Sequence, residues 1–338
     1  MSETWSRVDR LVDACLEAAT PEVLIAHGVG LVAAHRLHET GQPVPVALQR
    51  EREVAAFLQL AAHSLLLRLR ALLDGPMILI KGPEVAAHYP DAVMRSFGDL
   101  DILVPDSASA RRALLRAGFV DIADYEFPHT QRPLRWPGCP LLIELHHALP
   151  WLPGMHPPAA ATYFSRAIPS RTGIAGIETL PEVDHALLVA AHAWKHAPLN
   201  RLGDLLDVTA MADGQDGARL RARARQIGLG PVWDTTQGTI EELLSHAGEG
   251  GVRLPLWARH LYPPRQRSVF EAHLARWVGS IARPTPTGKL RAVVATLRQD
   301  MGPLPGEPWS HKMERTLRAV REARRPSLLR RRAPSRSG

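Results

Sequence analysis

Cysteine is scarce in this sequence, and its scarcity limits the possible architectures. Only Cys15 and Cys139 occur among the 338 residues, and they are far apart along the chain. Two such residues cannot supply the disulfide framework of a small secreted domain. We therefore expect a protein that works in a reducing, cytoplasmic setting.

Long apolar runs are also missing. No stretch of 18 apolar residues occurs, and the nearest candidate, residues 55–73, contains His63, Arg68 and Arg70. The first residues, MSETWSRVDRL, lack the basic start and apolar core of a signal peptide. We therefore expect no signal peptide, no membrane-spanning segment and no membrane partner.

Aromatic residues make up only 5% of the chain, against 45% hydrophobic residues in total. This balance predicts a globular protein with an aliphatic core. The eight tryptophans are scattered, so they form no stacking platform of the kind that binds single-stranded nucleic acid.

The positive charge is concentrated at one end of the chain. Residues 311–338 contain ten Lys or Arg and two Glu, a local charge of +8. The whole chain carries +7, so residues 1–310 carry −1. A basic tail of this kind can contact polyanions or can be a solvated end. Charge therefore does not make the body of the protein a nucleic-acid binder.

The apolar patterns divide the chain into four parts. Residues 1–75 predict an N-terminal helical region that ends in a long helix over residues 46–73. Residues 76–180 predict an α/β core with strands at 77–80, 100–104 and 139–145. Residues 181–300 have helical spacing again, and residues 301–338 form a linker and the basic tail. The expected fold class is α+β, a mixed sheet with helices between two helical regions.

The strongest local pattern is Arg95-Ser96-Phe97-Gly98-Asp99-Leu100-Asp101. Two aspartates at i and i+2 on a strand point to the same side of the sheet. Carboxylates that close repel each other unless they are solvated or share a divalent cation, and oxygen ligands favour Mg²⁺ or Mn²⁺. Arg95, four residues before Asp99, could hold a phosphate or the carboxylates.

Two further elements favour the metal hypothesis. Lys81-Gly82 follows the first strand and opens a helix, where backbone N–H groups and a lysine suit phosphate. Glu144 brings a third carboxylate to a later apolar strand, where a charge is costly unless it faces a site or a partner. The alternative for Glu144 is a salt bridge to Arg95 or Arg135. His146 follows it and could orient a carboxylate or act on an acceptor hydroxyl.

A second group of polar residues lies in the helical region after the core. His192, Lys195 and His196 share one helical face, and Asp204 and Asp207 repeat at i+3 on the next helix. The group could form an interhelical ion-pair network, a His/Asp metal site without a known zinc spacing, or a clamp in which Lys195 and His196 bind nucleotide phosphates.

These motifs together resemble a family of uncharacterised bacterial nucleotidyltransferases in the DNA polymerase β-like superfamily. The resemblance covers residues 77–211: a K-G turn, an R-x-x-x-D-x-D strand, an acidic-x-His segment and an H-x-x-K-H…R-L-x-D-L-x-D helical pattern. Lys81-Gly82 stands where the best-studied members of the superfamily have Gly-Ser.

The resemblance implies transfer of a nucleotidyl group from a nucleoside triphosphate. In that mechanism Asp99, Asp101 and Glu144 would be the catalytic metal ligands. The nucleotide would contact Lys81, Gly82, Arg95, Lys195 and His196, with His146, His192, Asp204 and Asp207 as accessory residues. The acceptor, a small molecule, peptide, protein or RNA, is not specified. Alternatives are a toxin-like enzyme that modifies tRNA or protein, and a catalytically inactive nucleotide-binding protein.

Overall fold

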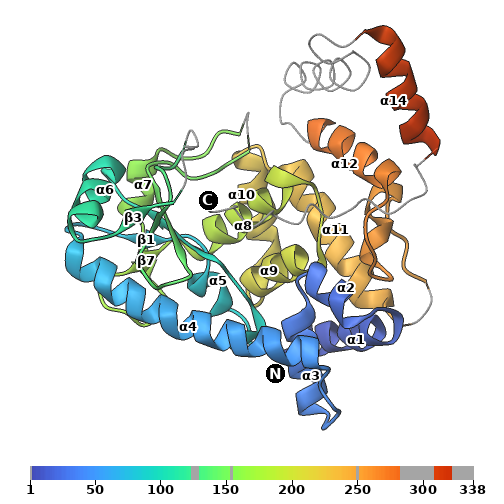
Figure 1. The fold of residues 1–338 in the computed structure, drawn as a ribbon, viewed down its shortest axis with the longest axis horizontal. Helices are drawn as coiled ribbons and strands as arrows, with labels where there is room; N and C mark the ends of the chain where they lie inside the picture. The colour runs from blue at the N-terminus through green and yellow to red at the C-terminus, as the bar shows by residue number, and fades with distance from the viewer. Residues whose placement is uncertain (1, 123–128, 153–154, 249–250, 282–307, 322–338) are drawn as a thin grey trace.

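The structure is a computed structural model, which describes residues 2–122, 129–152, 155–248, 251–281 and 308–321 (Figure 1). Its α/β part contains an open, mixed sheet of seven strands in the order β3-β4-β5-β2-β1-β7-β6. β2 runs parallel to β5, β1 runs parallel to β7, and the other neighbours are antiparallel. The strands are β1 (Ile78–Leu79), β2 (Asp99–Leu103), β3 (Val120–Asp121), β4 (Leu134–Arg135), β5 (Leu142–His146), β6 (Ile168–Pro169) and β7 (Glu178–Thr179).

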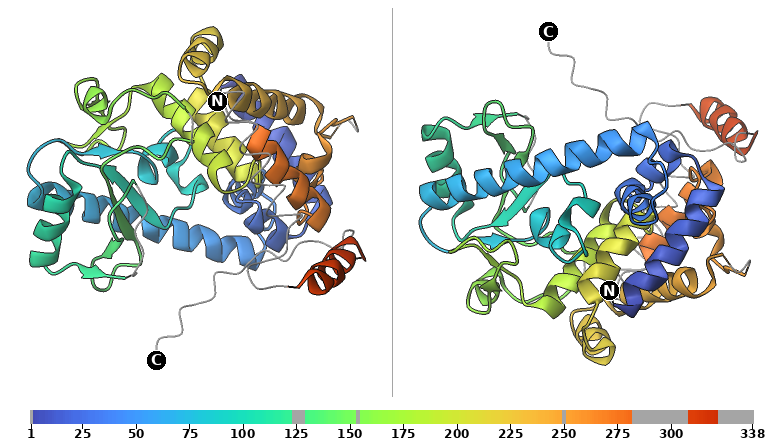
Figure 2. Two further views of the ribbon diagram at one scale, coloured as in Figure 1. Left: turned by 90° about the horizontal axis from the view of Figure 1, so that it is seen from above. Right: turned by 90° about the horizontal axis from the view of Figure 1, so that it is seen from below.

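One long helix, α4 (Val46–Leu72), covers a face of this sheet (Figures 1 and 2). Its Leu58, Ala62, Leu65 and Leu69 recur at spacings of three and four, so they form a stripe that packs into the core beneath the sheet. Ile102 of β2 belongs to the same core. Shorter helical segments flank the sheet: α5 (Pro83–Ala86), η1 (Ala92–Met94), α6 (Ser107–Arg116) and α7 (Ala160–Phe164).

The helices before and after the sheet share a single hydrophobic core. Val8 near the N-terminus, Val189 and Leu205 after the sheet, and Leu243 further on all belong to it. The sequence divides these residues between two regions, but the structure packs them as one body. The helices are α1 (Glu3–Ala18), α2 (Pro21–Ala26), α3 (Gly30–Glu39), α8 (Glu182–His196), α9 (Leu202–Ala212), α10 (Gly217–Gln226), α11 (Gly230–His246), η2 (Leu256–Leu261) and α12 (Val269–Ile281).

The elements expected from the sequence are present, with shifted ends. The strands at 77–80, 100–104 and 139–145 become β1, β2 and β5, the long helix expected over 46–73 forms as α4, and residues 181–281 contain the expected helices. The helix after Gly82 is shorter than expected and ends at Ala86. α14 (Trp309–Arg321) lies in the basic tail; most of the expected linker and residues 322–338 lie outside the described residues.

Within the described part of the chain, α4 is one helix that is long and apolar enough to cross a membrane, judged by length and composition alone. A core helix of a soluble protein passes the same test, and α4 packs its inner stripe on the sheet.

Candidate metal and phosphate site

Two neighbouring parallel strands bring the acidic motifs together. In β2 and β5, Asp101 pairs in register with Glu144, and Leu103 pairs with His146. Alternate residues of a strand lie on the same face of a sheet. Asp99 and Asp101 on β2 therefore share one face with Glu144 and His146 on β5, as the sequence predicts for the two aspartates.

The side chains of Asp101, Glu144 and His146 form a compact cluster. His146 Nε2 donates a hydrogen bond of 2.9 Å to Asp101 Oδ1 and lies 3.8 Å from Glu144 Oε2. One ligand atom from each of the three residues lies within 4.8 Å of the others. Asp101 and His146 are buried, whereas Glu144 is partly exposed, so the cluster opens towards solvent on the Glu144 side.

The protein stabilises the negative charge of Asp101 more than that of Glu144. Burial alone would raise the pKa of Asp101, but the Lys81 ammonium at 3.6 Å and the hydrogen bond from His146 together hold this pKa well below its usual value. Its Oδ2 atom is buried, and no described residue gives that atom a hydrogen bond. Asp101 therefore stays ionised, and its Oδ2 atom has the ion pair with Lys81 but no hydrogen bond.

The Glu144 carboxyl has the opposite electrostatic environment. Burial raises the pKa of Glu144, and the negative charges of Asp101 and Asp99 raise it further. Asp99 itself is half-buried at the start of β2. A positive charge between these carboxylates would relieve the repulsion that Glu144 experiences.

The Lys81-Gly82 turn fixes the backbone beside the cluster. Gly82 has φ +66°, in the left-handed region that favours glycine. A Cβ atom at this position would lie 2.9 Å from the Asp99 carbonyl oxygen. Only glycine lets the turn approach β2 this closely, which places Lys81 next to Asp101.

Helix α8 contributes a second positive group. The Lys81 ammonium donates to His192 Nε2 at 2.9 Å, and the Lys195 ammonium donates to His129 Nε2 at 2.9 Å. The His129 ring stacks on the ring of His146, with centroids 5.6 Å apart. Burial and the nearby Lys81 charge lower the pKa of Lys195. The structure thus brings Lys81, His192 and Lys195 together around the cluster.

Arg95 is held by the helical body. Its guanidinium donates to both carboxylate oxygens of Asp207 on α9, at 2.7 and 2.9 Å, and to the Gly82 carbonyl oxygen at 3.1 Å. The Tyr89 hydroxyl also donates to Asp207, at 2.7 Å. Although burial acts to lower it, the Asp207 charge raises the pKa of Arg95 above its ordinary value. This network ties the Lys81-Gly82 turn to α9.

The contacts of the two aspartates on α9 differ from the expected ion-pair network. Asp204 pairs with Arg201 at 2.8 Å, and Asp207 pairs with Arg95. Of the three alternatives, an ion-pair network from these aspartates to Lys195 does not form within the described residues, where both aspartates pair with arginines. The side chain of His196 lies outside the described residues. Its predicted role, like phosphate binding by Arg95, stays a prediction.

No sequence motif points to His129 as a site residue. It precedes no recognisable motif, and its position in the site depends on a long-range contact. The His147 N–H donates to the His129 carbonyl oxygen at 3.2 Å, which fixes this segment beside the end of β5. The shared helical face of His192 and Lys195 on α8 is the one local pattern nearby, and it does not identify the partner of Lys195.

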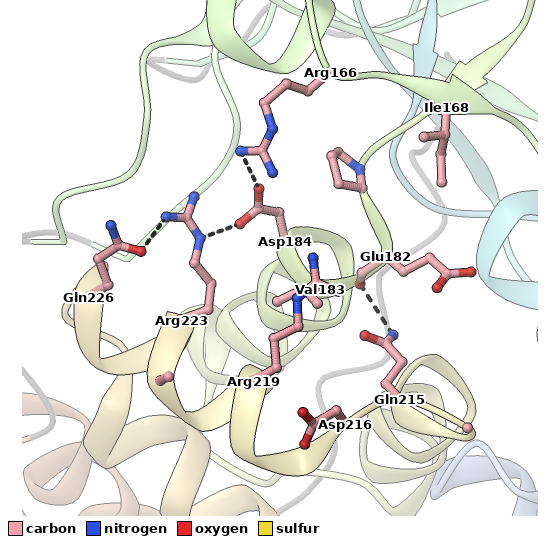
Figure 3. Close-up of a pocket in the computed structure, with 13 residues that line it drawn as sticks. Arg166, Ile168, Glu182, Val183, Asp184, Gln215, Asp216, Arg219, Arg223 and Gln226 are labelled. Atoms are coloured by element: carbon pink, nitrogen blue, oxygen red, sulfur yellow. Dashed lines mark hydrogen bonds and ion pairs between the residues drawn. The ribbon is translucent and has the colours of Figure 1, made fainter.

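A separate cavity of about 770 Å³ lies at the other end of α8, between that end and α10 (Figure 3). Asp184, on the first turn of α8, pairs there with Arg223 at 2.7 Å and with Arg166 at 3.5 Å. His192 is eight residues further along the helix, about 12 Å at 1.5 Å per residue. The cavity is therefore distinct from the carboxylate cluster.

The residues present suit a divalent cation. Two carboxylates and an imidazole are the donors that first-row divalent metals accept, and carboxylate oxygens also serve Mg²⁺. The raised pKa of Glu144 marks a place where a positive charge would be stabilising. The three side chains could hold a metal ion, and their donor atoms suit more than one divalent metal.

The fold and the cluster define an α+β protein with an acidic site on one face of a mixed sheet. Residues 19–244, about two-thirds of the chain, match the family model described as uncharacterised nucleotidyltransferase. The chain therefore belongs to that family, which confirms the resemblance found in residues 77–211. Membership of this family implies that the protein is a transferase. No curated protein and no solved structure matches the chain significantly.

Proposed function

We propose that this protein is a metal-dependent nucleotidyltransferase with a polymerase β-like core, which moves a nucleoside monophosphate from a nucleoside triphosphate to a hydroxyl-bearing acceptor. The observation that carries the proposal is the buried cluster of Asp101, Glu144 and His146 next to Lys81, in a chain of a nucleotidyltransferase family.

Asp101 and Glu144 would hold the metal, with Asp99 from the same face of β2. When bound, Mg²⁺ or Mn²⁺ supplies positive charge that polarises the α-phosphate and neutralises the leaving pyrophosphate. His146 can serve as a ligand or keep Asp101 oriented through its hydrogen bond. An imidazole among the ligands favours Mn²⁺ over Mg²⁺.

The residues around the cluster would bind and orient the substrates. Lys81 and Lys195 would contact the triphosphate. Their two ammonium groups lie near the acidic site and would neutralise the negative charge of a triphosphate bound there with its metal. Glu144, ionised when the metal is bound beside it, would help to activate the acceptor hydroxyl and would take up its proton. The bond from the acceptor oxygen to the α-phosphorus forms as the bond to pyrophosphate breaks.

The acceptor remains the open part of the proposal. A toxin-like enzyme that modifies tRNA or protein would use the same cluster, and the basic tail could hold its target. A nucleotide-binding protein without turnover would keep triphosphate affinity but release no pyrophosphate.

The proposal is tested by incubating the protein with α-labelled ATP, GTP, CTP or UTP, cell extract, and Mg²⁺ or Mn²⁺. We expect pyrophosphate release and a labelled product that Asp101→Asn does not form. The class of labelled product identifies the acceptor. Triphosphate binding without label transfer or pyrophosphate release under any of these conditions would favour the inactive binding protein.

A further inference from the structure

The outward face of α4 is apolar although its inward face already packs on the sheet. Val54, Phe57, Leu60 and Leu67 are exposed by 55, 57, 73 and 50%. Phe57, Leu60 and Leu67 lie on the side of the helix away from the core stripe that includes Leu65. Figure 2 shows that α4 crosses one outer side of the molecule without an element in front of it.

The exposed face has the spacing of a helix-pairing seam. Glu53, Phe57, Leu60, Ser64 and Leu67 follow each other at alternating steps of four and three residues. This spacing keeps one face of a helix directed at a partner helix along several turns. Exposed apolar side chains aligned in this way mark an interaction surface rather than an ordinary scatter of surface residues.

The seam is self-complementary about a point beside Leu60. Phe57 lies three residues before Leu60 and Ser64 four residues after it, so two antiparallel copies place a large side chain opposite a small one. A parallel pair would instead place identical side chains, including Phe57, opposite each other.

The charges at the two ends of the seam select the same orientation. Glu53 lies seven residues before Leu60 and Arg68 eight residues after it. Antiparallel copies therefore place each Glu53 carboxylate near the partner copy's guanidinium, whereas parallel copies would place like charges together. Arg68 Cζ lies 3.9 Å from the centroid of the Trp136 ring, which holds the guanidinium at this end of the helix.

From this geometry we propose that α4 is a homodimer interface, in which two copies of the chain pair antiparallel along the seam of Glu53, Phe57, Leu60, Ser64, Leu67 and Arg68. A C₂ dimer requires a surface that complements itself, as this seam does. One helix seam buries less than the roughly 800 Å² per partner of a standard interface, so we expect a reversible dimer with a dissociation constant on the order of micromolar.

Sedimentation velocity on the full chain over a wide concentration range tests the interface. We expect a monomer–dimer equilibrium that Phe57→Glu weakens by roughly tenfold or more. Phe270→Glu is the matched control, because Phe270 is also exposed, by 46%, but lies on α12. A thermal melt checks that both variants fold.

Charge reversal and cross-linking test the orientation. Glu53→Arg and Arg68→Glu should each weaken the dimer, and the double variant should restore it. In a Cys139→Ser background, Leu60→Cys should form a disulfide-linked dimer. Val46→Cys should not, because antiparallel pairing separates the two Val46 residues by roughly 42 Å.

Two results would overturn the proposal. One is a monomer at every concentration. The other is flotation with phosphatidylcholine–phosphatidylglycerol vesicles that is lost in Phe57→Glu, which would assign the face to a membrane. These measurements need no nucleotide, so their outcome is independent of the proposed transferase activity.

Discussion

Asp101 and Glu144 occupy paired positions of two parallel strands, but their pKa values shift in opposite directions. Lys81 and His146 stabilise the charge of Asp101. Glu144 is half-buried near two other carboxylates, and its charge is disfavoured. The cluster therefore contains one acid that is satisfied by the protein and one that needs a further positive charge.

Glu144→Gln should raise the melting temperature of the metal-free protein at neutral pH by about 1–3 °C. The raised pKa of Glu144 means that its contribution to stability is present at low pH and is lost as the pH rises through that pKa. Glutamine keeps the uncharged form at every pH. The gain over the wild type should therefore shrink as the pH falls.

Thermal melts across a pH series with a chelator measure this difference. Added Mn²⁺ should stabilise the wild type and have little effect on Glu144→Gln. A variant less stable than the wild type at neutral pH without metal would contradict the electrostatic account.

Gly82→Ala should destabilise the protein and weaken triphosphate binding, because its new methyl group would meet the Asp99 carbonyl oxygen at 2.9 Å. Gly41→Ala is the matched control: Gly41 has φ +70°, but no atom lies within 4 Å of its added Cβ. Both variants bear the strain of a positive φ, so the difference between their melting temperatures measures the close approach. Equal losses would mean that the contact with β2 does not matter.

At the scale of helices and strands, Arg95 connects α9 to the Lys81-Gly82 turn, because its guanidinium contacts both Asp207 and the Gly82 carbonyl oxygen. Asp207→Ala should cost about 3–5 kcal/mol of unfolding free energy, because it leaves the buried Arg95 charge without its partner. Asp204→Ala should cost much less, since the side chain of its partner Arg201 is 50% exposed. Urea unfolding of both variants measures the two values, and similar losses would count against this role of Asp207.

Individual helices and strands could be predicted from the sequence, because their apolar spacing depends on residues close together in the chain. The aspartates of β2 share a face by strand geometry, and α8 has regular helical spacing. The partners of Arg95 and Lys195 could not be predicted, because they come from residues 112 and 66 positions away in the chain. The two-residue strands β6 and β7 were missed for a similar reason: their pairing, not their composition, defines them.

At the scale of the whole molecule, the positive charge and the acidic site lie in different parts of the chain. Residues 1–310 carry −1, whereas residues 311–338 carry +8. A chain that ends at Pro308 should therefore keep its triphosphate affinity and lose salt-dependent binding to RNA. Filter binding across a salt series, beside calorimetry with triphosphates, measures both. Equal RNA affinity of the two chains, or loss of triphosphate binding in the shorter one, would contradict this division.

The central claim is that the cluster of Asp101, Glu144 and His146 binds a divalent metal together with a nucleoside triphosphate. Isothermal titration with each of the four triphosphates, with and without Mn²⁺, tests it most directly in the wild type, Asp101→Asn and the control Asp121→Asn on the edge strand β3. We expect metal-dependent binding of at least one triphosphate in the wild type and in Asp121→Asn, and its loss in Asp101→Asn. Binding that needs no metal, or that survives unchanged in Asp101→Asn, would contradict the account.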